Sequence, residues 1–240
     1  MLLGSGLGSQ LLGWTEGLCA EIASRGFRVI RFDNRDVGLS TKLEGKPPYT
    51  LSDMAADAAG LLGALRIPAA HIVGASMGGM IAQQFAIEHP GSTLTLTSVM
   101  SNLGGDDSIL ATREVAALLV QPPAETREGR IEQSVAATRI TWGPSFEEER
   151  ARVRATRAID RSFYPEGTVR QFQAINASGS RREGLGGVRA PILVIHGDGD
   201  PLVPFANAEV ILAAAPKGAE LYVMKGVGHE MPPSEWPPIA

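Results

Sequence analysis

The stretch that decides the fold is Ile72-Val73-Gly74-Ala75-Ser76-Met77-Gly78-Gly79. A short apolar run typical of a buried strand ends in the pattern Gly-x-Ser-x-Gly, and a run typical of a helix follows. A serine in such a pattern occupies a tight turn from strand to helix. Small residues are needed on both sides of it because the strand and the helix approach closely there. Five residues can match by chance, so the rest of the chain has to support the interpretation.

Apolar runs alternate with helical stretches on both sides of this turn. We expect strands at residues 1–4, 27–32, 71–74, 94–100, 192–196 and 220–224, and helices at 14–24, 51–65, 77–88 and 206–214. Glycine and proline stop these helices. The alternation is typical of parallel strands joined by helical crossovers. The predicted class is therefore α/β, with a mostly parallel sheet and flanking helices.

The pattern changes between the fourth and fifth of these strands. Strand signals are absent there, and short helices rich in Arg and Glu are separated by Pro122-Pro123, Gly143-Pro144 and Pro165. We predict a helical insertion at residues 102–187 and a core made of residues 1–101 and 188–240. The run Glu147-Glu148-Glu149-Arg150, followed by Arg152, Arg154 and Arg157, places opposite charges three and four residues apart. That spacing favours a solvated helix face over a substrate-binding one.

Composition excludes several classes of function. The 240 residues are 44% hydrophobic and 20% charged, which is enough to build one sizeable core. The net charge of −4 offers no basic surface for a run of phosphates, so no nucleic-acid partner is expected. Cys19 is the single cysteine and cannot form an internal disulfide, and the four histidines do not have zinc-ligand spacing. Neither a metal nor a cofactor is expected.

The apolar N-terminus does not read as a targeting segment. No Lys or Arg precedes it, and Trp14 and Glu16 stand where a cleavage site would need small residues. Nor does any charge-free apolar run reach 18 residues, so we predict no membrane span and a cytoplasmic protein. The glycines at positions 4, 6 and 8 do not fit the spacing of a dinucleotide-binding loop.

A serine hydroxyl needs a general base to become a nucleophile, and the base needs a carboxylate to hold it. Asp200 follows the expected strand at 192–196, and His229 follows the one at 220–224. Loops at the carboxyl ends of parallel strands converge on one edge of the sheet, so Ser76, Asp200 and His229 can meet there. We predict these three as the catalytic residues.

Alternatives exist for two of the roles. Asp198 competes with Asp200 as the acid, although Pro201 favours Asp200 by fixing a turn, and Asp106 and Asp107 are minor alternatives. The remaining histidines, His71, His89 and His196, are expected to be structural, or in the case of His196 to support the site.

Acyl transfer also needs hydrogen-bond donors for an oxyanion. The amide of Met77, directly after the serine, is one candidate. The loop Gly4-Ser5-Gly6-Leu7-Gly8 follows the first strand, and its glycines let the backbone turn inward. Leu7 or Gly6 is the predicted second donor.

Two further segments carry a resemblance. Residues 26–41, Gly-Phe-Arg-Val-Ile-Arg-Phe-Asp-Asn-Arg-Asp-Val-Gly-Leu-Ser-Thr, and residues 196–204, His-Gly-Asp-Gly-Asp-Pro-Leu-Val-Pro, resemble the α/β-hydrolase superfamily, in the bacterial esterase-like branch that includes aclacinomycin methylesterase. The resemblance implies that residues 102–187 form a helical cap over the active site and that Leu7 is the oxyanion donor. It also implies that, relative to the family, the chain lacks the first two strands and the last helix.

Together these features predict a serine hydrolase that cleaves small-molecule carboxylic esters through an acyl-enzyme intermediate. A proline-type aminopeptidase, a lactonase or a cofactor-free perhydrolase would use the same triad. A ligand-sensing protein that kept the fold without catalysis is the alternative from a different class.

Overall fold

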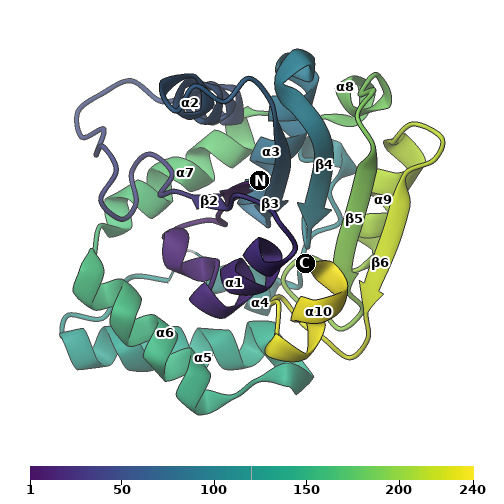
Figure 1. The fold of residues 1–240 in the computed structure, drawn as a ribbon. Helices are drawn as coiled ribbons and strands as arrows, with labels where there is room; N and C mark the ends of the chain where they lie inside the picture. Colours follow the sequence, from purple (N-terminus) through teal and green to yellow (C-terminus); the bar gives the residue numbers. More distant parts are fainter. Residues whose placement is uncertain (120) are drawn as a thin grey trace.

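A computed structural model describes residues 1–119 and 121–240, and a single six-stranded sheet organises them (Figure 1). The strand order is β2-β1-β3-β4-β5-β6, and every pairing is parallel. The strands are β1 (Leu2–Gly4), β2 (Ile30–Arg31), β3 (Ala70–Ala75), β4 (Thr93–Val99), β5 (Ile192–Gly197) and β6 (Glu220–Met224). The predicted α/β class with a mostly parallel sheet is confirmed.

Five helices connect or follow the strands: α1 (Glu16–Ser24), α2 (Leu51–Ala64), α3 (Met77–Glu88), α9 (Ala206–Ala214) and α10 (Trp236–Ile239). The predicted bounds of α3 and α9 are confirmed. The expectation that α1 begins at Trp14 is wrong by two residues, because the Thr15 hydroxyl caps the helix by accepting a hydrogen bond from the Leu18 amide. No helix in the described part of the chain is long and apolar enough to cross a bilayer.

The strand predicted at residues 27–32 is much shorter than expected. Only Ile30 and Arg31 pair, with Leu2 and Leu3 of β1, and the backbone of Met1 adds hydrogen bonds to the Arg28 carbonyl and the Ile30 amide. β2 lies at the edge of the sheet, so no second neighbour extends it. The ring of Phe27, outside the strand, packs edge-on against His71 at 5.4 Å between centroids.

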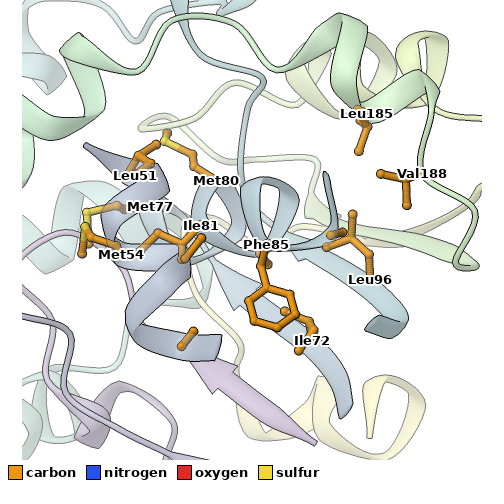
Figure 2. Packing of buried hydrophobic residues seen from close by; sticks show 14 of the residues in the cluster. Leu51, Met54, Ile72, Met77, Met80, Ile81, Phe85, Leu96, Leu185 and Val188 are labelled. Atoms are coloured by element: carbon orange, nitrogen blue, oxygen red, sulfur yellow. The ribbon is translucent and has the colours of Figure 1, made fainter. Parts of the chain in front are cut away.

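Side chains alternate between the two faces of the sheet, as parallel strands require. Leu2 belongs to a core with α2, α3 and α9, whereas Leu3 belongs to a core with α1 and α10. Figure 2 shows part of the first core around Phe85 of α3, which is fully buried together with Ile72 and Leu96 from β3 and β4. Burying both faces fixes the strand register and therefore the positions of the strand ends.

Between β4 and β5 the chain forms α4 (Arg113–Ala117), α5 (Arg127–Trp142), α6 (Glu148–Arg161), α7 (Pro165–Ala177) and α8 (Arg182–Gly186). α5 and α6 pack on each other through a small core of their own, made of Ile131, Val135, Trp142, Ala151 and Ala155. Figure 1 shows this helix pair beyond the carboxyl ends of the strands. The helices thus stand over the edge of the sheet at which Ser76 lies.

Candidate active site

Ser76 occupies the single residue between β3 and α3. Its backbone has φ 57° and ψ −123°, a conformation that costs energy for a residue with a side chain. Two hydrogen bonds hold Ser76 in this conformation. The Ser76 amide donates to the Val99 carbonyl at 2.9 Å, and the Ser101 hydroxyl donates to the Ser76 carbonyl at 2.9 Å. The strained turn lifts the serine side chain out of both elements and places it on the wall of a cavity.

The glycines around Ser76 are required because a larger side chain at either position would clash with neighbouring backbone atoms. A Cβ on Gly74 would overlap the carbonyl of Gly78, and a Cβ on Gly78 would overlap the carbonyl of Gly4. The three backbones of β1, β3 and α3 are therefore in direct contact. This close approach explains why the pattern Gly-x-Ser-x-Gly was the most informative part of the sequence.

Asp200 and His229 are hydrogen-bonded to each other. The His229 Nδ1 lies 2.7 Å from the Asp200 Oδ2, and the Asp200 side chain is fully buried. The other carboxylate oxygen, Oδ1, accepts hydrogen bonds from the amides of Leu202 at 2.8 Å and Val203 at 2.9 Å. Asp200 is thus fixed by its own loop and directs one oxygen at the imidazole.

This geometry sets the tautomer of His229. An ionised carboxylate only accepts, so Nδ1 carries the proton that is donated to Asp200, and Nε2 keeps a lone pair. His229 and Ser76 line the same cavity of about 580 Å³. Within the described residues the Ser76 hydroxyl has no hydrogen-bond partner, a common situation in a site without substrate.

The two predicted oxyanion donors also lie next to Ser76. Leu7 and Gly6 line the cavity, and a Cβ built on Gly6 would be 3.6 Å from the Ser76 Oγ. Neither the Leu7 amide nor the Met77 amide has a hydrogen-bond acceptor in the part of the chain that is described. Both are therefore available to a ligand, whereas the Gly8 amide is already bound to the Gln171 side chain at 2.9 Å.

The competing acids are occupied elsewhere. Asp198 accepts from the Gly226 amide at 2.7 Å and pairs with Lys225 at 3.2 Å, and these two contacts lower the pKa of its carboxyl. Asp107 bonds the Ser180 hydroxyl and Arg182, which likewise lower its pKa. Neither contacts His229, and Asp106 is exposed.

The remaining histidines lie outside the cavity lining. His71 bonds the Thr95 hydroxyl at 2.9 Å, and the His89 ring packs against the Phe85 ring at a tilt of 48°. His196 is fully buried, and its Nε2 donates to the Val203 carbonyl at 2.8 Å beside Asp200. Burial lowers the pKa of His196, so it remains a neutral support of the Asp200 loop.

The loop that carries His229 is anchored to the inserted helices. The His229 amide donates to the carbonyl of Thr141, near the end of α5, at 2.7 Å. A Cβ on the preceding Gly228 would overlap the carbonyl of Trp142, so the two backbones are in contact there too. The position of the imidazole therefore depends on α5 as well as on the sheet.

A buried ion pair adds to this anchor. Glu230, with a side chain only 2% exposed, pairs with Arg150 of α6 at 2.9 Å, and the Arg150 guanidinium lies 4.4 Å from the centre of the Trp142 ring. Burial raises the pKa of Glu230, and its contacts with Ser145 and Arg150 offset only part of that rise. An acid whose pKa is raised by folding stabilises the protein at low pH and loses that contribution as pH increases.

The change Arg150→Met is expected to destabilise the protein by about 3 kcal/mol at pH 7, because it leaves the Glu230 carboxylate buried without its partner. The loss should be smaller near pH 5. Burial raises the pKa of Glu230, and the loss of Arg150 removes a contact that lowers it, so a fall in pH favours the neutral carboxyl, which needs no partner. Urea denaturation at both pH values measures the difference. Arg152→Met on the same helix is the control, and an equal loss at pH 5 and pH 7 would contradict the expectation.

The charged side chains of α6 lie on two sides of the helix, the outer side and the side that lines the cavity. Arg152 pairs with Glu132 on the outside, as a solvated face requires. Arg157 is exposed as well and pairs with the exposed Glu16 of α1 at 2.8 Å. The expectation is wrong for Arg150, which pairs with the buried Glu230. Positions 150, 154 and 157 recur at the spacing of one helix stripe, and that stripe is turned towards the cavity.

Sequence patterns did not reveal two further residues that support the site. Gln171 of α7 is fully buried, and besides binding the Gly8 amide it donates to the Arg35 carbonyl at 2.8 Å. It therefore holds the loop that contains Leu7. Glu230 is the second, although its place directly after His229 is a signal that could have been used.

Comparison with known proteins identifies relatives. Residues 1–234 match the family described as alpha/beta hydrolase fold. Rhodomycin D methylesterase DauP of Streptomyces sp. (strain C5) is 28% identical over 262 residues, which cover 100% of this chain and 88% of that protein. Its counterpart DnrP of Streptomyces peucetius is 27% identical with the same coverage.

Solved structures are similar along nearly the whole chain. The enol-lactonase of Burkholderia xenovorans has 25% identity and a TM-score of 0.74 over 95% of this chain and 83% of its own. The esterase of Exiguobacterium antarcticum has 23% identity and a TM-score of 0.79 over 98% of this chain and 86% of its own, a likeness of fold.

Proposed function

The chain belongs to the α/β hydrolase fold family, and from that premise we propose that it is a serine hydrolase that cleaves carboxylic esters of small molecules through an acyl-enzyme intermediate. The observation that carries the proposal is the hydrogen bond from His229 to the buried Asp200, because His229 and Ser76 line the same cavity. The methylesterase name of the full-length relative supports an ester as the substrate.

The first half of the reaction uses the lone pair on the His229 Nε2. His229 removes the proton of the Ser76 hydroxyl as the Oγ attacks the ester carbonyl carbon, and the carbonyl oxygen becomes negative. Asp200 stabilises the imidazolium that forms and keeps its orientation. His229 then gives the proton to the alkoxide that leaves, and the acyl group remains on Ser76.

Water completes the cycle. His229 takes a proton from a water molecule, which attacks the acyl-enzyme, and then returns the proton to the Ser76 oxygen as the carboxylic acid departs. The amides of Leu7 and Met77 hold the negative oxygen in both halves of the reaction. These steps require the residues of the chain and water alone.

The inserted segment, residues 102–187, acts in this proposal as a cap. Its helix α5 binds the His229 amide and its helix α7 binds the Gly8 amide, so it supports both the base and the oxyanion loop. Its helix α6 supplies one wall of the cavity. Substrate selection is therefore assigned to the cap, and the chemistry to the loops of the sheet.

A fluorophosphonate probe tests the proposal directly, since such probes react much faster with an activated serine than with an ordinary hydroxyl. We expect covalent labelling of Ser76, located by peptide mass spectrometry, together with turnover of short p-nitrophenyl esters. The variant Ser76→Ala provides the blank. Absence of labelling in protein that unfolds cooperatively would exclude the nucleophile and favour a ligand-sensing role.

A further inference from the structure

One arginine on the cavity wall has no partner among the described residues. The stripe of α6 that lines the cavity carries Arg150, Arg154 and Arg157. Arg150 forms an ion pair with Glu230, and Arg157 forms one with Glu16. Within residues 1–119 and 121–240, the Arg154 guanidinium has neither an ion pair nor a hydrogen-bond acceptor.

The surroundings of Arg154 are partly apolar, so a guanidinium without an anionic partner is unfavourable there. The residue is half-buried, and its guanidinium carbon is 5.7 Å from the centre of the Trp142 ring. Its Nη2 reaches to 3.8 Å from where a Cβ on Gly13 would lie, just beyond the oxyanion loop. Burial lowers the pKa of Arg154; attraction by Glu230 offsets part of this effect, and repulsion by Arg150 adds a smaller lowering. A cation drawn partly out of water is stabilised when an anion arrives.

The carboxylates that share the cavity do not fill this role. Both oxygens of Glu230 already contact the Arg150 Nη2, at 2.9 and 3.1 Å. Glu147 lies 3.6 Å from Arg150, and Glu149 is exposed at the rim. Arg154 thus offers a planar set of N–H donors inside the cavity, a geometry that matches a carboxylate in two parallel hydrogen bonds.

We propose that Arg154 binds a carboxylate on the substrate, so that the preferred esters are monoesters that carry a second, free carboxylate. The preference among esters rests on the proposed serine-hydrolase function, but the anion site itself does not depend on it. Arg154 is a specificity-determining residue, since it holds a part of the substrate that does not react.

Matched esters test the specificity. The p-nitrophenyl monoesters of glutaric and adipic acid place the free carboxylate at two distances on the acyl side, and 4-acetoxybenzoate places it on the leaving group. The neutral references are p-nitrophenyl valerate and 4-acetoxybenzamide. We expect Arg154→Met to lower kcat/KM for at least one carboxylate ester by roughly tenfold to a hundredfold relative to its neutral reference, the range for one charge-assisted pair. Arg154→Lys should restore part of the loss.

Arg152→Met is the matched control, because it removes an arginine from the outer side of the same helix. Arg157→Met is less suitable, since it would weaken the pairing of Glu16 at the cavity wall. Equal losses for charged and neutral esters in Arg154→Met would overturn the proposal. So would a preference of the wild type for p-nitrophenyl 5-aminovalerate, which would point to the exposed Glu149 and an amine.

A binding measurement separates this proposal from the proposed function. Calorimetry with monomethyl glutarate is done on the Ser76→Ala protein and on the double variant with Arg154→Met. Binding that weakens roughly tenfold or more in the double variant supports the anion site even if no ester is turned over. Equal binding by the two proteins, or none by either, overturns it whatever the esterase activity.

Discussion

Replacement of Ser76 by alanine is expected to lower kcat/KM for esters by about a millionfold, and replacement of His229 by alanine should cost nearly as much. In the proposed mechanism the two side chains act as a unit: without the base the hydroxyl stays protonated, and without the hydroxyl the base has nothing to activate. The double variant should therefore be hardly slower than either single one. Steady-state kinetics on one p-nitrophenyl ester, with active-site titration, measures all three.

Ser52→Ala is the matched control for these variants. Ser52 lies on α2, and its hydroxyl bonds the Glu88 side chain rather than lining the cavity. Its activity should equal that of the wild type. Losses that multiply in the double variant would show that Ser76 and His229 act in separate steps, against the proposed mechanism.

The second large effect is expected from Asp200→Asn, about a ten-thousandfold loss in kcat/KM. The amides of Leu202 and Val203 both donate to one oxygen of this side chain. In the variant they would hold the amide oxygen of the asparagine, so its NH₂ group would face the His229 Nδ1. Nδ1 would then have to accept, and the proton would move to Nε2, where the imidazole can no longer take one from Ser76.

Asp198→Asn is the comparison for this variant. The Asp198 side chain bonds the Gly226 amide and Lys225, so it should affect the adjacent turn and leave kcat/KM within a few-fold of the wild type. If Asp198→Asn proved the more damaging change, Asp198 would be the acid and the role proposed for Asp200 would be wrong.

Much of the fold could be predicted because its signals are local. A proline ends a helix through its own backbone geometry, so the helix ends predicted before Pro90 and Pro216 agree with those of α3 and α9 in the structure. The length of β2 could not be predicted in this way. The apolar run at residues 27–32 is typical of a strand, but the number of residues that pair depends on how this segment meets the short strand β1 in space.

In the candidate site too, the residues with local sequence signals could be predicted and the tertiary contacts could not. Ser76, Asp200 and His229 each follow an apolar run, and parallel strands place their carboxyl ends at a common edge of the sheet. The contacts of the inserted helices depend on how helix and sheet meet in space. Nothing in the sequence around Arg150 or Gln171 indicates that one binds Glu230 and the other the Gly8 amide. Tertiary partners of long polar side chains have no periodic signature.

The bond between the His229 amide and the Thr141 carbonyl has a consequence for the working cycle. Any outward swing of α5 that widens the mouth of the cavity would withdraw the carbonyl that accepts from the His229 amide, and with it the support of the loop that carries the imidazole. With α5 displaced, the proposed base would lose its orientation and the protein would not turn over substrate until the helix closed again. Release of product and readiness for the next round would be governed by one motion.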